Sequence, residues 1–229
     1  MLVLPAVEES EELSPLLRQA AHDSEARERL REQFARLAEG LFIFQRLRMD
    51  GLPYVGPDDV LAECGRDLDG ISQIAPALAR AIQGRLRSLE TAAARLPAEE
   101  IVLSHGAFRY NQLLLRGDTL IALDLDALCL SGIGADAGEF LAYLDLTALR
   151  RPHLRTIIQD VEVVFVATLS RHARVDPRWV NWHRAASHVK WTQRTFLSLD
   201  AKWPALTEEL LQVAERTLSG LLVGSTEPC

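Results

Sequence analysis

Two carboxylates and an amide in the middle of the sequence could bind a metal ion. Asp124 and Asp126 follow the apolar run 120–123, and Gln112 stands just before the apolar run 113–115. If the later run is a strand that continues through Asp126, side-chain alternation places both aspartates on one face. Carboxylate and amide oxygens are hard ligands that suit Mg²⁺. The pattern indicates either a magnesium site at Asp124, Gln112 and Asp126 or, as a simpler alternative, turn capping or a buried hydrogen bond to the preceding loop.

A polar loop precedes this cluster and could display it. The segment 104–112 reads Ser-His-Gly-Ala-Phe-Arg-Tyr-Asn-Gln and joins two apolar runs. Its polarity and its glycine are typical of a loop that presents side chains from a rigid scaffold. His105 within it is more simply explained as a structural histidine than as an acid or base.

A small β element must position this loop. The runs 101–104, 113–115 and 120–123 are apolar and lack helical spacing, so they predict three short strands. The segment 116–119, Arg-Gly-Asp-Thr, lies between the last two and predicts a tight hairpin turn. The hairpin would bring the amide and the two acids together.

Helices account for the rest of the predicted fold. Apolar residues between positions 30 and 44 recur at the spacing of one buried stripe, which predicts a helix from a cap at Ser24 to about Arg48. The sequence predicts seven or eight helices in total, and Asp136 is expected to be the N-cap of its helix. Besides a helix around 157–169, further helices are expected to begin at or near Pro57, Pro76, Asp136, Pro177 and Pro204.

The composition excludes several classes of protein. Of the 229 residues, 48% are hydrophobic and 25% are charged, which argues against disorder, collagen and coiled coil. The net charge of −7 argues against a broad nucleic-acid-binding surface and suits a cationic ligand. Cys64, Cys129 and Cys229 are odd in number and far apart, so they indicate neither a disulfide framework nor a metal site.

The sequence also predicts no membrane association. No apolar run approaches the roughly 20 residues that a membrane-spanning helix needs. The N-terminus lacks the positive region of a signal peptide and is acidic between Glu8 and Glu12. We therefore expect a cytoplasmic protein.

The loop and hairpin resemble the catalytic half of the aminoglycoside phosphotransferase and choline kinase-like family. His105-Gly106, Gln112-Leu-Leu, the 121–126 segment Ile-Ala-Leu-Asp-Leu-Asp and the later Asp136-Ala-Gly-Glu stand in the family's order at similar separations. The resemblance covers roughly residues 35–220. It implies a mostly α, protein-kinase-like C-lobe with a small β-hairpin and without an N-lobe.

The resemblance also implies a division of the chain into three parts. Residues 1–23 would be an acidic helical N-terminal segment, residues 24–223 the kinase-like helical C-lobe, and residues 224–229 a flexible tail.

Three positions are implied to hold a metal ion. Asp124 falls at the family's aspartate that holds Mg²⁺ on the nucleotide phosphates. Gln112 falls at its metal-binding asparagine, where glutamine keeps the amide oxygen but reaches one methylene further. Asp126 stands where an acid is common and would be a further ligand or a support for one. The implied cofactors are therefore Mg²⁺ and ATP.

The structural positions of the catalytic loop are also present. His105 and Gly106 match the residues that begin the loop, and the histidine would tie it to the metal-binding strand. Asp136 matches an aspartate that braces the loop and does not react.

The position of the family's catalytic aspartate is Ala107. A methyl group cannot accept a proton, and proton transfer by a placed group contributes about 10²–10⁴-fold to catalysis. Asp126, Arg109 or Tyr110 could be suggested as substitutes, but nothing in the sequence places them correctly. No residue is therefore assigned as catalytic.

The features of a kinase N-lobe are also missing from the sequence before the loop. The first lysine of the chain is Lys190, and no glycine-rich phosphate loop or series of strands precedes His105. The phosphate-anchoring lysine of the family therefore has no counterpart in this part of the chain.

These observations leave two functional hypotheses. The first is a catalytically degenerate phosphotransferase-like protein that serves as a binding or scaffold subunit and holds a metal, a peptide or a cationic small molecule. The second is an ATP- and Mg²⁺-dependent kinase of small-molecule or peptide hydroxyls that needs an N-lobe from another chain. The apolar run 40–44 is either buried in the core or covered by a protein partner or second copy at the face of the missing lobe.

Overall fold

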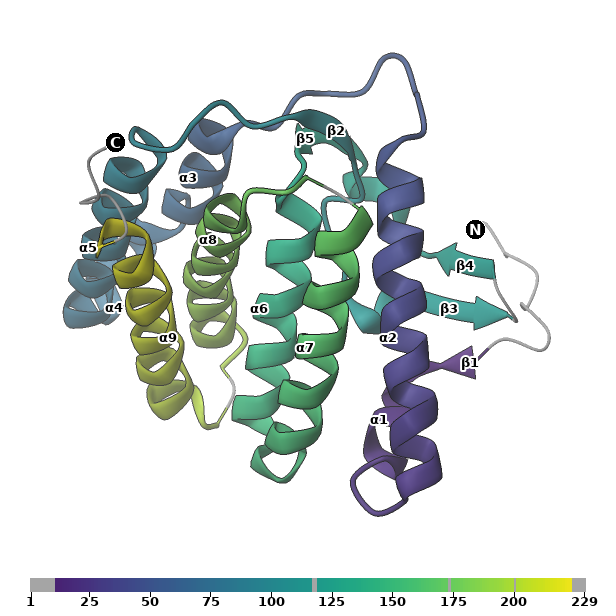
Figure 1. The fold of residues 1–229 in the computed structure, drawn as a ribbon. Helices are drawn as coiled ribbons and strands as arrows, with labels where there is room; N and C mark the ends of the chain where they lie inside the picture. Colours follow the sequence, from purple (N-terminus) through teal and green to yellow (C-terminus); the bar gives the residue numbers. More distant parts are fainter. Residues whose placement is uncertain (1–10, 117–118, 173, 200, 224–229) are drawn as a thin grey trace, which may run out of the picture.

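The computed structural model describes residues 11–116, 119–172, 174–199 and 201–223. Helices predominate, and two small antiparallel sheets lie among them (Figure 1). The α-helices are α1 (Leu13–Gln19), α2 (Ser24–Gln45), α3 (Pro57–Gly65), α4 (Leu68–Ile74), α5 (Pro76–Ala93), α6 (Ala135–Arg150), α7 (Arg155–His172), α8 (Pro177–Leu197) and α9 (Trp203–Val223). The strands are β1 (Glu11–Glu12), β2 (Ile101–Ser104), β3 (Leu113–Arg116), β4 (Thr119–Ala122) and β5 (Cys129–Gly132).

The long helix α2 is confirmed, but its ends differ from the prediction. Asp23 is the N-cap, since its side chain accepts hydrogen bonds from Glu25 N at 2.9 Å and Ala26 N at 3.4 Å. The expected cap at Ser24 is therefore wrong by one residue. The helix ends at Gln45, three residues earlier than expected.

The predicted hairpin is confirmed, although its turn residues 117–118 lie outside the described residues. β3 and β4 pair in antiparallel fashion from Leu113↔Ala122 to Arg116↔Thr119. β1 adds to the other edge of β3 to give the order β1-β3-β4. Figure 1 shows this sheet at one side of the molecule beside α2, away from α3, α4, α5 and α9.

A second sheet consists of β2 and β5, and β5 was not predicted. The two strands pair from Ile101↔Gly132 to Ser104↔Cys129. β5 has the sequence Cys-Leu-Ser-Gly, which shows neither an alternation of apolar and polar residues nor a continuous apolar run. Only its pairing with β2 therefore defines it as a strand.

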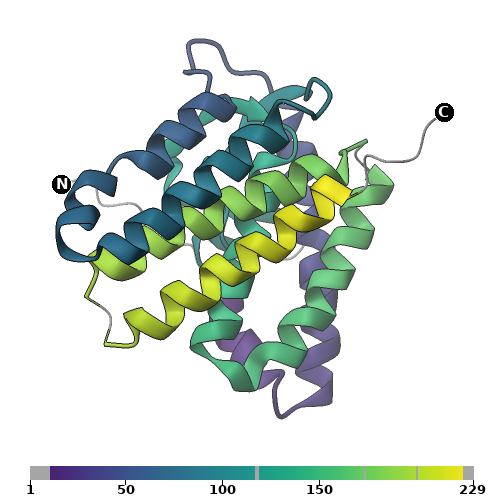
Figure 2. The ribbon, with the colours of Figure 1, turned by 90° about the vertical axis from the view of Figure 1, so that its left-hand side faces the viewer.

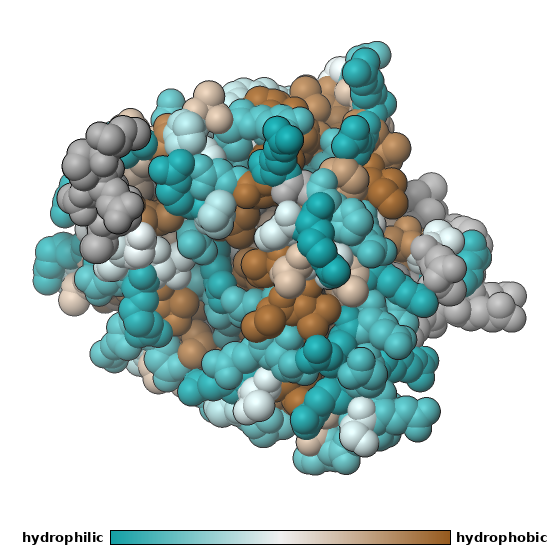
Figure 3. Space-filling view, viewed as in Figure 1, coloured by the Kyte–Doolittle hydropathy of each residue, from teal (hydrophilic) through white to brown (hydrophobic). Residues whose placement is uncertain are grey.

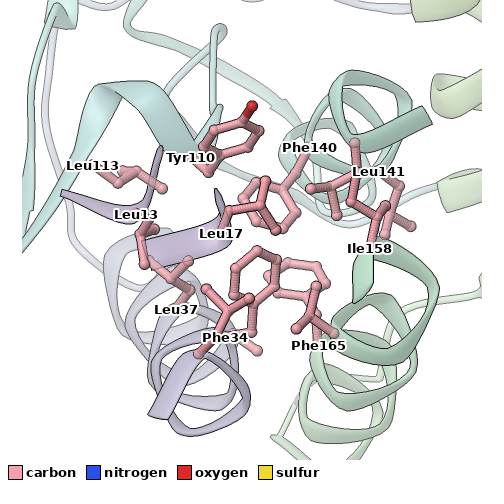
Figure 4. Close-up of a cluster of buried hydrophobic side chains, with 14 of the residues drawn as sticks. Leu13, Leu17, Phe34, Leu37, Tyr110, Leu113, Phe140, Leu141, Ile158 and Phe165 are labelled. Atoms are coloured by element: carbon pink, nitrogen blue, oxygen red, sulfur yellow. The ribbon is translucent and has the colours of Figure 1, made fainter. Parts of the chain in front are cut away.

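One core lies between α1, α2, α6 and α7. Phe140 lies at its centre, with ring centroids 5.7 Å from Phe34 and 4.5 Å from Phe165. Leu13 and Leu17 of α1 are buried in the same cluster (Figure 4). The described part of the 1–23 segment therefore packs on the core of the region that follows it.

A second core joins α3, α4 and α5 to α8 and α9. Figure 2 shows α8 and α9 running beside the earlier helices. Trp182 is fully buried and donates from its indole nitrogen to Leu89 O at 2.8 Å. Trp179 donates to Pro97 O at the same distance. These tryptophans are core residues, as their helical spacing predicts.

Neither described cysteine forms a disulfide: Cys64 and Cys129 are free and buried. Burial raises the pKa of the Cys64 thiol to about 12. No helix within the described ranges is both long and apolar enough to span a membrane.

A partly buried polar network connects α6, α7 and α8. Arg184 binds Asp145 with two hydrogen bonds of 2.8 Å and reaches Glu162 at 2.7 Å. His188 Nε2 lies 2.8 Å from the same aspartate. Burial would raise the pKa of Asp145, but the hydrogen bonds from His188 and Arg184 outweigh it and lower this pKa to about 2.

We expect Asp145→Asn to lower the free energy of unfolding by about 1.5–3 kcal/mol at pH 7, because it weakens the charge-assisted hydrogen bonds to Arg184 and His188. The folded pKa of Asp145 is below the unfolded value of about 3.9, so this stabilisation is present above pH 4 and is lost toward pH 2. Urea denaturation at pH 7, 4 and 2.5 should show the difference from wild type shrinking as the pH falls.

Glu215→Gln is the matched control, because its partner Arg85 holds it at the surface. Its effect should stay below about 1 kcal/mol. An Asp145→Asn effect as small as that of Glu215→Gln would show that the network does not stabilise the helices.

Candidate functional site

The loop 104–112 follows directly from β2, and its sharp turn depends on Gly106. This residue has φ +71°, a conformation that favours glycine. A Cβ at this position would lie 2.2 Å from Ala127 O. The glycine therefore lets the loop pack against the segment that follows Asp124.

Asp136, in the first turn of α6, fixes the start of the loop 104–112. Its carboxylate accepts hydrogen bonds from Ser104 Oγ at 2.9 Å, His105 N at 2.9 Å and Gly106 N at 3.1 Å. Gly134 is the N-cap of α6, so the expectation that Asp136 caps this helix is wrong. Burial raises the pKa of Asp136 above its ordinary value. The geometry is that of a brace for the loop.

His105 connects the loop to the chain before Asp124. Its side chain is fully buried, and Nε2 lies 3.0 Å from Leu123 O. Its ring also contacts Phe44 and Phe108. This position suits a structural histidine.

The hairpin brings Gln112 and Asp124 into direct contact. Gln112 O accepts from Leu123 N at 2.9 Å, and Gln112 Nε2 donates to Asp124 Oδ2. Asp124 has φ +59°, a left-handed conformation in which aspartate is one of the more frequent residues. The amide oxygen of Gln112 points away and accepts from Arg109 Nε at 3.1 Å. The three side chains form a hydrogen-bonded chain, Arg109–Gln112–Asp124.

Asp126 does not share a strand face with Asp124. β4 ends at Ala122, and Asp126 lies exposed in a 3₁₀ turn, Leu125–Ala127. The expected strand alternation is therefore wrong, because the left-handed residue Asp124 redirects the chain before a second strand position is reached.

These residues as arranged do not fit a Mg²⁺ ligand set. Gln112 presents its amide nitrogen to Asp124, and an amide nitrogen does not bind Mg²⁺. The described ranges contain no cluster of three or more His, Cys, Asp or Glu side chains that could hold a metal. Metal binding at Asp124, Gln112 and Asp126 stays a prediction that requires the Gln112 amide to turn over.

Ala107 lies half-buried between Gly106 and Phe108, and its neighbours do not replace a catalytic carboxylate. Tyr110 is buried with its hydroxyl 3.0 Å from Thr147 Oγ1, and burial raises its pKa. Arg109 carries a positive charge and cannot accept a proton. None of these three residues therefore replaces the carboxylate as a general base.

An aromatic platform under Arg109 was not predicted. The guanidinium lies 5.6 Å from the centre of the Trp191 ring and 5.8 Å from that of Tyr143. Arg194 lies 5.1 Å from the same indole. Trp191 is about eighty positions from the loop in sequence, so no local signal could have associated it with Arg109.

Neither a protein-family model nor a curated protein sequence matches this chain. Solved structures do. A choline/ethanolamine kinase family protein from Mesorhizobium loti superposes with a TM-score of 0.65 at 12% identity, covering 96% of this chain and 76% of that one. This chain has the fold of the kinase-like phosphotransferases, which confirms the mostly helical, kinase-like fold with a small hairpin that the resemblance implied. The lack of an N-lobe stays a prediction.

Two further structures show the same fold with ligands bound to them. A glucosamine kinase in complex with glucosamine, ADP and inorganic phosphate has a TM-score of 0.61 at 16% identity, over 95% of this chain and 59% of that one. An amicoumacin kinase in complex with AMP-PNP and Ca²⁺ has a TM-score of 0.55 at 12% identity, over 80% and 60%. The chain thus spans about 60% of the length of these two kinases.

We expect Gly106→Ala to lower the free energy of unfolding by about 2–4 kcal/mol, because it adds backbone strain and a clash with Ala127 O. Chemical denaturation measures the change. Gly84→Ala on α5 is the control: its Cβ meets no atom within 4 Å, so alanine should stabilise the helix by about 0.5–1 kcal/mol. Equal effects of the two substitutions would contradict the role of Gly106.

Proposed function

We propose that this chain is a phosphotransferase-like protein that does not transfer phosphate by itself and acts as a binding or scaffold subunit. The observation that carries the proposal is the loop: it keeps its brace, its histidine and its glycine, but it has Ala107 where a proton acceptor is needed. A scaffold that retains its architecture without its reacting group is suited to binding.

The hydrogen-bonded chain Arg109–Gln112–Asp124 supports the same conclusion. The amide oxygen of Gln112 is engaged by Arg109, and the Asp124 carboxylate is engaged by the amide nitrogen. Both groups that would bind a metal are thus satisfied by protein, and the arginine supplies positive charge nearby. A resting site of this kind is stable without a cation.

The described residues before the loop also lack the parts that hold ATP phosphates. Within residues 11–100 the structure describes β1 as the one named strand, and it pairs with β3. The sequence contains no lysine before Lys190, which is paired with Glu63 on α3. We infer that a phosphate clamp would have to come from outside residues 11–223.

An exposed apolar face supports a protein partner. Ile43 and Leu47 near the end of α2 are 62% and 54% exposed. Together with β4, His105 and Phe108 they line a groove of about 500 Å³. An exposed apolar groove is a feature of association surfaces. Within the run 40–44, Leu41 is buried in the core and Ile43 is exposed, and coverage of this face by a partner stays a proposal.

A second candidate function rests on this face. It lies against His105, so a chain docked there would stand beside the catalytic loop and could supply an N-lobe. The complex would then be an ATP- and Mg²⁺-dependent kinase of small-molecule or peptide hydroxyls. Ala107 argues against it, because the partner would also have to provide the proton acceptor.

We expect millimolar ATP with Mg²⁺ to leave the melting temperature of the isolated chain unchanged. A ligand at 100 times its dissociation constant would add about 2.7 kcal/mol of stability, which thermal denaturation detects readily. A rise that is lost in Asp124→Asn and kept in the control Asp69→Asn on α4 would contradict the proposal. It would favour the kinase.

We expect a partner of this chain to be retained in affinity purification by wild type and lost by Ile43→Asp. The added charge opposes burial of the apolar face. Val163→Asp is the matched control, because Val163 is an equally exposed apolar residue on α7. Loss of the partner with both variants, or with neither, would show that this face does not bind it. Phosphate transfer by the purified complex would identify the second candidate function.

A further inference from the structure

A second groove lies at the end of α2, away from Gln112 and Asp124. It encloses about 700 Å³ between the segment 46–50, the β2–β5 sheet and the residues that follow α7. Phe42, Val102, Leu130 and Ile133 belong to its apolar lining. Figure 3 shows hydrophobic residues reaching the surface over this end of α2, among hydrophilic neighbours.

The charges around this groove are mainly positive. Arg46, Arg48 and Arg174 line it, against the acids Asp50 and Glu100. The side chains of Arg48 and Arg174 make no hydrogen bond or ion pair with any other residue in the described part of the chain. Two guanidinium groups without a partner among the described residues thus lie beside an apolar hollow in a protein with a net charge of −7. Such groups bind carboxylate and phosphate through paired hydrogen bonds.

A buried amide adds a third feature. Gln45 also lines the groove, is 4% exposed, and donates from Nε2 to Ile133 O at 2.9 Å. Its Oε1 has no hydrogen-bond partner among the residues that the structure describes. A buried acceptor without a donor is unfavourable, so an N–H or O–H group of a ligand would relieve it.

We propose that this arginine-rimmed groove binds a small amphipathic anion. The ligand has an apolar body that packs on Phe42 and Val102, a carboxylate or phosphate group that Arg48 and Arg174 bind, and a hydrogen-bond donor for Gln45. The volume is that of a small-molecule pocket, and its combination of an apolar lining with few polar groups is usual for such pockets. The proposal does not rest on the scaffold function proposed above, although Leu47 lines both grooves.

The proposal is tested by calorimetric titration of the full chain with N-decanoylglycine, kept below its micelle concentration. This probe has an apolar chain, an amide N–H and a carboxylate. Its methyl ester keeps the chain and the amide N–H but carries no charge, and it should bind at least 10-fold more weakly although it is the more apolar molecule. N-decanoylaminomethylphosphonate keeps the decanoyl chain and the amide N–H, so tighter binding than N-decanoylglycine would favour a phosphate-type head group and weaker binding would favour carboxylate. This phosphonate is the second anionic probe.

Substitution of the arginines that line the groove tests whether N-decanoylglycine binds there. Arg48→Ala with Arg174→Ala should weaken binding of N-decanoylglycine at least 10-fold and leave the ester unchanged. Arg80→Ala with Arg87→Ala, two exposed arginines of α5, is the matched control and should bind as wild type does. Ile43→Asp should also bind as wild type, because Ile43 does not line this groove.

Three results would overturn the proposal. They are equal affinity for the acid and its ester, unchanged binding after removal of Arg48 and Arg174, and no binding of either anionic probe at millimolar concentration. The melting temperature of each variant shows that it is folded.

Discussion

The buried carboxylate of Asp136 is the contact on which the candidate site depends. It holds the start of the loop through Ser104, His105 and Gly106, and it stands on α6, which packs against α8 and the core around Phe140. A carboxylate is stable in such surroundings because it accepts several hydrogen bonds. The helical core therefore determines the positions of the site residues. The loop would keep its shape whether or not it performs chemistry.

The ends of the hairpin determine what this loop can do. Pairing of Leu113 with Ala122 places Gln112 beside Asp124, and the left-handed conformation of Asp124 turns the following residues away. Arg109, supported by Trp191 and Tyr143, completes a chain of hydrogen bonds that satisfies both groups. Charge and hydrogen bonding are thus balanced internally, where a phosphotransferase of this fold would balance them with a cation and a nucleotide.

The end of α2 exposes both apolar side chains and arginines. Ile43 and Leu47 face solvent beside one groove, and unpaired arginines stand around the next. Apolar surface and unpaired charge each favour association with something outside the chain. The apolar groove beside Ile43 and the arginine-rimmed groove lie within a few residues of one another along α2. Their chemistry differs: the first suits a protein partner and the second suits a small anion.

The sequence by itself determined the helices, the hairpin, the loop and the kinase-like fold, because these depend on local spacing and on a series of motifs in order. Apolar periodicity places α2, α7 and α8, and the residues around 104–126 carry the resemblance. It also determined that Ala107 offers no proton acceptor. Only the tertiary structure decided that β5 is a strand, that Asp126 leaves the face of Asp124, that Gly134 rather than Asp136 caps α6, and that Arg109 rests on Trp191. Each of these four features depends on contacts between residues distant in the chain or on a single backbone angle. Neither long-range contacts nor a single backbone angle produce a periodic signal in the sequence.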